Sequence, residues 1–119
     1  MFYPDQHARQ SLAIKLGLPI HDHMQDWEYE VSDPKRIGDY LKLYDQSITS
    51  DKERESLMEM TLQSLEDLLE EDRLEEFAVY EKLTEERLIK FSELHYKTLN
   101  YWSSGNFKVS KYIRNIKKH

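Results

Sequence analysis

Residues 50–77 read SDKERESLMEMTLQSLEDLLEEDRLEEF, and this stretch decides the fold. Ser50 and Glu53 form the S-x-x-E pattern of a capping box, which predicts the start of a helix. Apolar residues then recur every three or four positions, as on the buried face of an amphipathic helix. These residues are Met58, Leu62, Leu65, Leu68 and Leu69. The spacing predicts a long helix that packs against the core.

This long helix should end near residues 71–73. If it continued, Asp72 and Glu76 would fall in the middle of its apolar face, where unpaired carboxylates are costly to bury. A second helix is expected to follow and to bring four apolar residues to the core: Phe77, Val79, Tyr80 and Leu83. The acidic residues of the stretch therefore flank a junction between two helices.

Capping and spacing signals predict four further helices, over about residues 4–16, 34–44, 84–102 and 109–116. Pro4 and Pro34 suit a first helical turn, and Gly17 suits the position just after a helix. Thr84 is expected to cap the helix that runs to about Trp102. The last helix is basic and has an apolar stripe.

Residues 20–33 do not follow a helical period. Trp27, Tyr29 and Val31 alternate with two glutamates, a pattern typical of an extended segment with one buried face. No second strand is available to pair with it, so we expect an extended loop near residues 20–33. The sequence as a whole predicts an all-α, single-domain bundle of residues 1–119 with about five or six helices.

Composition narrows the classes of protein to which the chain can belong. The 119 residues suit one domain, and the absence of cysteine excludes disulfides and thiolate metal sites. No apolar run approaches the roughly 20 residues that a membrane-spanning helix needs. The first ten residues, MFYPDQHARQ, lack the pattern of a secretory signal. These features favour the cytoplasm and no contact with a membrane.

Charge is distributed unevenly along the chain, whose formal net charge is −6. Residues 51–86 contain 14 acidic and 4 basic residues, whereas residues 106–119 contain 5 Lys or Arg and no acidic residue. An acidic body disfavours nucleic acid, because phosphates need a basic surface. A basic protein is the partner that this charge favours.

The acidic cluster at the helix junction is the main candidate for a binding surface. Its members are Glu66, Asp67, Glu70, Glu71, Asp72, Glu75 and Glu76. Carboxylates at the end of a helix oppose the helix dipole, and neighbouring turns repel each other. Tyr101 and Trp102 are candidate aromatic contacts, since aromatic side chains dominate many interfaces. Solvation of the cluster, or neutralisation by the basic last helix, is the alternative interpretation.

His21, Asp22 and His23 form the one stretch that suggests a metal. Two histidines separated by one residue point to the same side of an extended chain and can share a transition metal with a carboxylate. However, a metal site needs further ligands, and His7 and His95 have no diagnostic spacing. A polar loop that contains two histidines is therefore the favoured interpretation of the stretch, and the sequence predicts no cofactor.

The sequence favours a binding protein over an enzyme, because it contains no nucleophile elbow, zinc signature or general base with a recognisable partner. Our main hypothesis is a non-enzymatic acidic module that binds a basic protein, in its sharpest form an immunity or antitoxin-type inhibitor of a nuclease toxin. The first alternative is a metal-binding protein or metal-dependent enzyme that uses His21 and His23. The second is a structural module that forms homo-oligomers.

Overall fold

The computed structural model describes residues 2–21 and 23–117, and all regular structure in this part of the chain is helical. The elements are α1 (Gln6–Leu16), α2 (Trp27–Val31), the 3-10 turn η1 (Pro34–Arg36), α3 (Ile37–Tyr44), α4 (Asp51–Glu70), α5 (Leu74–Lys90), α6 (Tyr96–Ser104) and α7 (Ser110–Lys117). The all-α prediction is confirmed. The radius of gyration is 13.3 Å, close to the roughly 13.5 Å of one compact domain of this length.

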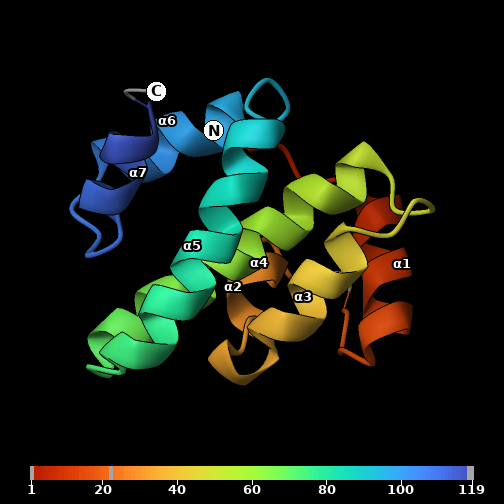
Figure 1. Cartoon of the computed structure of the whole chain (residues 1–119). Helices are drawn as coiled ribbons and strands as arrows, with labels where there is room; N and C mark the ends of the chain where they lie inside the picture. Colours follow the sequence, from red (N-terminus) through yellow and green to blue (C-terminus); the bar gives the residue numbers. More distant parts are fainter. Residues whose placement is uncertain (1, 22, 118–119) are drawn as a thin grey trace.

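Helix α4 runs through the middle of the fold (Figure 1), and α1, α2, α3 and α5 all pack against it. Its buried apolar residues include Leu57, Met58, Met60, Leu62, Leu65 and Leu68. Because they surround much of its circumference, the helix is stable only when other helices enclose it. Helices α6 and α7 pack on each other beside α5.

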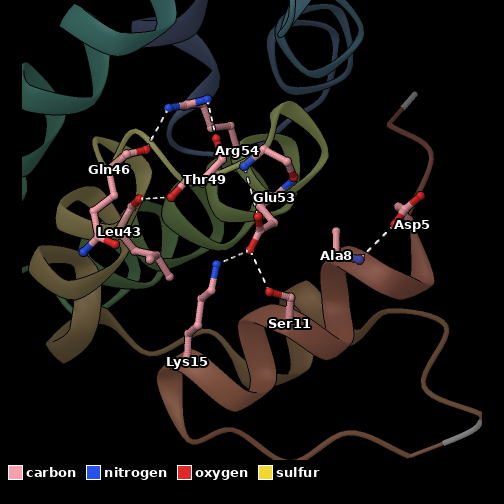
Figure 2. A network of polar contacts seen from close by, with 10 residues as sticks. Asp5, Ala8, Ser11, Lys15, Leu43, Gln46, Thr49, Glu53 and Arg54 are labelled. Atoms are coloured by element: carbon pink, nitrogen blue, oxygen red, sulfur yellow. Dashed lines mark hydrogen bonds and ion pairs between the residues drawn. The ribbon is translucent and has the colours of Figure 1, made fainter.

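The N-terminus of α4 is fixed by the predicted capping box. The Ser50 hydroxyl accepts from the Glu53 backbone N–H at 3.1 Å, and Glu53 Oε1 accepts from the Ser50 N–H at 3.0 Å. Glu53 Oε2 also accepts from the Ser11 hydroxyl and from Lys15 Nζ, each at 2.9 Å. Figure 2 shows that this carboxylate joins α1 to the first turn of α4.

Arg54, the next residue, fixes the connection between α3 and α4. Its guanidinium donates to the backbone carbonyl of Tyr44 at 3.0 Å. It also donates to the carbonyls of Gln46 and Thr49, at 3.1 and 2.7 Å (Figure 2). It also lies over the rings of Tyr44 and Phe91, about 5.5 Å from each centroid. The loop carbonyls are therefore satisfied by a side chain rather than left without partners.

Helices α1 and α4 end in the same way, in a Schellman motif. The residue in the left-handed conformation is Gly17 after α1, with φ 67°, and Asp72 after α4, with φ 57°. In the second motif the Arg73 N–H donates to the Leu68 carbonyl at 2.9 Å. The predicted end of the long helix near residues 71–73 is confirmed.

The expected extended loop near residues 20–33 is wrong for residues 27–31, which form the short helix α2. Its contacts are tertiary: the Trp27 indole donates to the Pro19 carbonyl at 2.7 Å, and buried Glu28 forms an ion pair with Arg9. Such contacts leave no period in the sequence. Helix α2 is also why the count of α-helices in the described residues is seven.

The expected cap at Thr84 is wrong as well. Helix α5 continues through this residue to Lys90, and the buried Thr84 hydroxyl donates to the Tyr80 carbonyl at 2.7 Å. The helix ends later than predicted, at Lys90, and the next helix, α6, begins at Tyr96. Phe77 is buried and Tyr80 is partly buried as predicted, but Val79 and Leu83 are exposed rather than in the core.

Replacing Asp72 by glycine should raise the free energy of unfolding by about 0.5–1 kcal/mol, because a residue without Cβ adopts a positive φ without strain. Urea unfolding at neutral pH measures the change. The control is Gly17→Ala at the matching position of α1, where a Cβ would meet no other atom and only the backbone is strained. It should lose about 1 kcal/mol. A less stable Asp72→Gly variant would show that the aspartate side chain contributes more than its backbone strain costs.

Candidate partner-binding surface

The turn between α4 and α5 carries five exposed carboxylates, at one end of the molecule (Figure 1). They belong to Glu70, Glu71, Asp72, Glu75 and Glu76, and we call residues 70–76 the acidic turn. Asp67, one turn earlier on α4, is partly buried and accepts from the Gln63 side-chain amide at 3.0 Å. Five of the seven predicted acidic residues thus lie together on the surface.

Arg73 is the one basic residue of the acidic turn and holds two of its carboxylates. Its guanidinium contacts Glu71 at 3.0 Å and forms a two-point contact with Glu76 at 2.6 and 3.0 Å. Glu70, Asp72 and Glu75 have no ion-pair partner among the described residues. The turn therefore keeps a net negative charge that faces solvent.

The carboxylates of this region repel one another. Partial burial raises the pKa of Asp67, and the charges of Glu71, Glu66 and Glu70 raise it further, against the hydrogen bond from Gln63. A raised carboxyl pKa means that ionisation is less favourable here than in water. The negative charges of Glu66, Glu70 and Glu71 thus make the ionised form of Asp67 less favourable in the folded protein.

Glu66 does not belong to this surface, because it is buried and has internal partners. Its two oxygens accept from the backbone N–H groups of Lys108 and Val109, at 3.0 and 2.8 Å. These groups stand at the start of α7, where a negative charge is favoured by the helix dipole. Glu66 therefore fixes the last helix to α4.

The two aromatic candidates differ in position. Trp102 is buried, and its indole N–H donates to Glu59 at 3.1 Å, so a partner would not reach it. Tyr101 is exposed, and its ring centroid lies 5.7 Å from that of Phe107. Phe107 in turn lines a surface hollow of about 520 Å³ together with Asp72. Tyr101 is thus exposed next to a residue of this hollow, whereas Trp102 belongs to the core.

The basic last helix borders the same hollow. Lys108, Lys111 and Arg114 line it opposite Asp72, with Leu74 and Tyr112 as apolar neighbours. The described side chains form no ion pair across it, and Arg114 instead donates to the Ser103 carbonyl at 3.0 Å. The two charged regions are therefore adjacent, but the basic helix does not cover the acidic turn.

Helix α5 exposes an apolar surface that the sequence reading missed. Leu74 and Val79 are each 60% exposed, and Leu83 and Ile89 are exposed further along the helix. Leu83 was expected in the core because the helix was predicted to end beside it, at Thr84. Plotting one continuous helix over residues 74–90 would have placed Val79 and Leu83 on the side away from Phe77 and Leu88, which are buried.

The histidine stretch forms no ligand cluster in the described part of the chain. His21 and His23 are exposed, and Asp22 lies outside the described residues. Among the described residues no three His, Asp or Glu side chains are grouped as metal ligands. His7 is exposed on α1, and His95 is buried far along the chain. The geometry thus gives the metal hypothesis no support.

His95 is held in the core by a tyrosine. Its Nε2 lies 2.6 Å from the Tyr44 hydroxyl, and its Nδ1 has no partner among the described residues. Burial lowers the pKa of His95 to about 4; the nearby Arg54 lowers it too, while Asp51 acts in the opposite direction. The imidazole is therefore neutral at physiological pH. The completely buried ring is out of reach of a substrate.

Two further glutamates are buried, Glu28 on α2 and Glu59 on α4. Arg9 contacts both oxygens of Glu28, at 2.9 and 2.6 Å, and the Ser56 hydroxyl also donates to Glu28. Glu59 Oε1 accepts from Tyr29 and Trp102, whereas its Oε2 meets no donor at hydrogen-bonding geometry among the residues that the structure describes. The Thr98 hydroxyl lies nearby, yet burial keeps the pKa of Glu59 above its usual value. These groups connect helices and are closed to solvent.

Comparison of the chain with family models, with curated proteins and with solved structures found no match. None of the described helices combines the length and apolar character that crossing a bilayer requires. The acidic turn and the apolar surface of α5 must therefore be interpreted from their own chemistry.

Glu66→Ala should lower the free energy of unfolding by about 3 kcal/mol, because it leaves two buried backbone donors without their charged acceptor. Chemical denaturation monitored by tryptophan fluorescence measures the loss. Glu70→Ala, one turn further along α4, should change stability by less than about 0.5 kcal/mol, because its carboxylate is exposed. Similar effects of the two substitutions would contradict the distinction between internal and surface glutamates.

Lowering the pH from 7 to 4 should destabilise the protein through His95. The unfolded chain binds a proton near pH 6.5, but the folded chain does so only near pH 4. The stability that neutral His95 contributes is therefore complete above the pKa of the unfolded chain and is lost as the pH falls towards the pKa of the folded chain. The free energy of unfolding should fall by roughly 3 kcal/mol in total. His95→Gln should show a shallower loss in urea unfolding at pH 7, 5.5 and 4. The exposed His7→Gln variant should match the wild type, and equal pH profiles for all three proteins would refute this.

Proposed function

We propose that this protein is a non-enzymatic binding module that engages a basic protein through the acidic turn and the adjoining exposed side chains of α5. The observation that supports this most is that exposed apolar side chains lie beside the five exposed carboxylates. Leu74 belongs to the acidic turn itself, and Val79 follows it on α5. Charge at the rim directs the encounter, and apolar side chains supply buried area.

The composition of the acidic turn argues for a partner rather than for solubility alone. Solubility needs charge, but it does not need like charges close enough to add to the rise that burial causes in the pKa of Asp67, nor an aspartate with φ 57° where glycine would be relaxed. Local choices that oppose stability are typical of surfaces with a binding role.

A second copy of the chain fits this surface poorly. In a two-fold symmetric dimer the same patch faces itself, which would bring the carboxylates of both acidic turns together. A partner with lysine or arginine at its surface removes that repulsion. The charge therefore favours a hetero-complex over the homo-oligomer.

The narrowest form of the proposal is an immunity or antitoxin-type inhibitor acting in the cytoplasm. A nuclease binds phosphates with a cationic active site, and a rigid row of carboxylates complements that site. Inhibition would then result from occlusion, without catalysis by the inhibitor. The observations that support this form are the exposed charge of the acidic turn and its fixed backbone.

Reversing Glu70, Glu71 and Glu75 to lysine should slow association with the partner about 10- to 100-fold at low salt and weaken the dependence on salt. The partner is first captured from host lysate at low salt, and association rates are then measured by surface plasmon resonance.

The matched control reverses Asp26, Glu30 and Glu93, three exposed acidic residues elsewhere on the molecule. It changes the net charge equally and should slow association much less. Equal rates for the two triple variants would reject the acidic turn as the binding surface. A captured partner that is a nuclease and stays fully active in the complex would reject the inhibitor form alone.

A further inference from the structure

An apolar groove of about 290 Å³ lies where α5, α6 and α7 meet. Its apolar walls are Leu88 and Ile89 of α5, Leu99 of α6 and Ile116 of α7. Ser92, Tyr96 and Asn100 complete the lining. Ile89 is 47% exposed and Tyr96 60% exposed, so the groove is open to a partner. Its volume is at the small end for ligand pockets and suits one large side chain.

Two carboxylates continue the α5 wall of this groove. Glu85 precedes Leu88 by three residues and Ile89 by four, and Glu81 stands one turn before Glu85. Residues at these separations are neighbours on one helix face, with Cβ atoms roughly 5–6 Å apart. Both glutamates are partly buried, in contrast to the exposed carboxylates of the acidic turn.

Neither glutamate has a counter-ion within the described part of the chain. No lysine or arginine side chain that the structure describes is paired with either of them. Burial raises the pKa of Glu81, and the charge of Glu85 and a hydrogen bond with it raise the pKa further. A cation placed beside this pair would relieve the repulsion.

We infer that this groove is an anchor site for a basic partner segment in which an aromatic or long aliphatic side chain stands next to a lysine or arginine. The apolar side chain fills the space between Leu88, Leu99 and Ile116, and the cation meets Glu81 and Glu85. The inference rests on the proposed function and deepens it, since buried anchors in pockets hold interfaces that surface charge only steers.

Binding of short peptides tests this without the natural partner. The ¹⁵N-labelled full chain is titrated with N-acetylated, C-amidated Trp-Lys and with the matching Trp-Glu and Gly-Lys peptides. Trp-Lys should shift the amide signals of Leu88, Ile89, Ser92 and Leu99 and bind at least about threefold more tightly than Trp-Glu, as expected for one partly exposed ion pair. Gly-Lys should shift these signals much less.

Two variants separate the parts of the site. Ser92→Trp, which places an indole at the groove itself, should abolish the shifts caused by Trp-Lys. Glu81→Gln combined with Glu85→Gln should remove the preference for Trp-Lys over Trp-Glu. The control, Glu75→Gln with Glu76→Gln on the acidic turn, makes the same change in charge and should keep that preference.

Three results would overturn the inference: no shifts in the groove, equal binding of Trp-Lys and Trp-Glu, or a chain that is dimeric and becomes monomeric on Ser92→Trp. The last result would identify a second copy as the occupant. A negative result in these peptide experiments would not contradict the acidic turn as a binding surface. Conversely, the variant with Glu70, Glu71 and Glu75 reversed to lysine should bind Trp-Lys as the wild type does. The two proposals therefore fail independently.

Discussion

The enclosure of α4 is the constraint on which the rest of the structure depends. In a helix surrounded by other helices, buried polar side chains need partners inside the protein, since a buried charge without partners is costly. Its buried polar groups reach different parts of the chain: Glu53 binds α1, Ser56 binds Glu28 of α2, Glu59 binds α2 and α6, and Glu66 binds the start of α7. The core thus brings the helices together, and these contacts set how each is placed against α4.

The same helix explains why the acidic turn is where it is. Between Glu53 and Leu69 most of α4 is buried, and its buried carboxylates, those of Glu53, Glu59 and Glu66, accept from donors on other parts of the chain. From Glu70 onward the enclosure ends, and glutamates of the same chemical type face solvent. Glu66 and Glu70 differ by one helical turn but have opposite roles, one holding α7 and the other leaving its charge free.

Local signals in the sequence predicted the parts of the fold that depend on local physics. The capping box at Ser50, Pro34 at the start of η1 and the end of α4 at Asp72 involve neighbours in the chain, and their side chains are diagnostic. Helix α2 and the internal role of Glu66 involve residues 19 to 43 positions away. No spacing in the sequence distinguishes a buried glutamate with distant donors from an exposed one. The sequence therefore located the acidic surface but assigned it Glu66 and Trp102, and it missed the exposed side of α5.

That exposed side of α5 is best understood together with the charge around it. A helix that buries few residues and leaves Leu74, Val79 and Ile89 in water would ordinarily promote self-association. Here the net charge of −6, concentrated on α4 and α5, opposes the approach of a second copy. The repulsion within the acidic turn and the exposed apolar side chains are each unfavourable for the isolated chain. The negative charge nevertheless limits the self-association that the apolar side chains would cause. A basic partner would relieve both at once, because it neutralises the carboxylates while it covers the apolar residues.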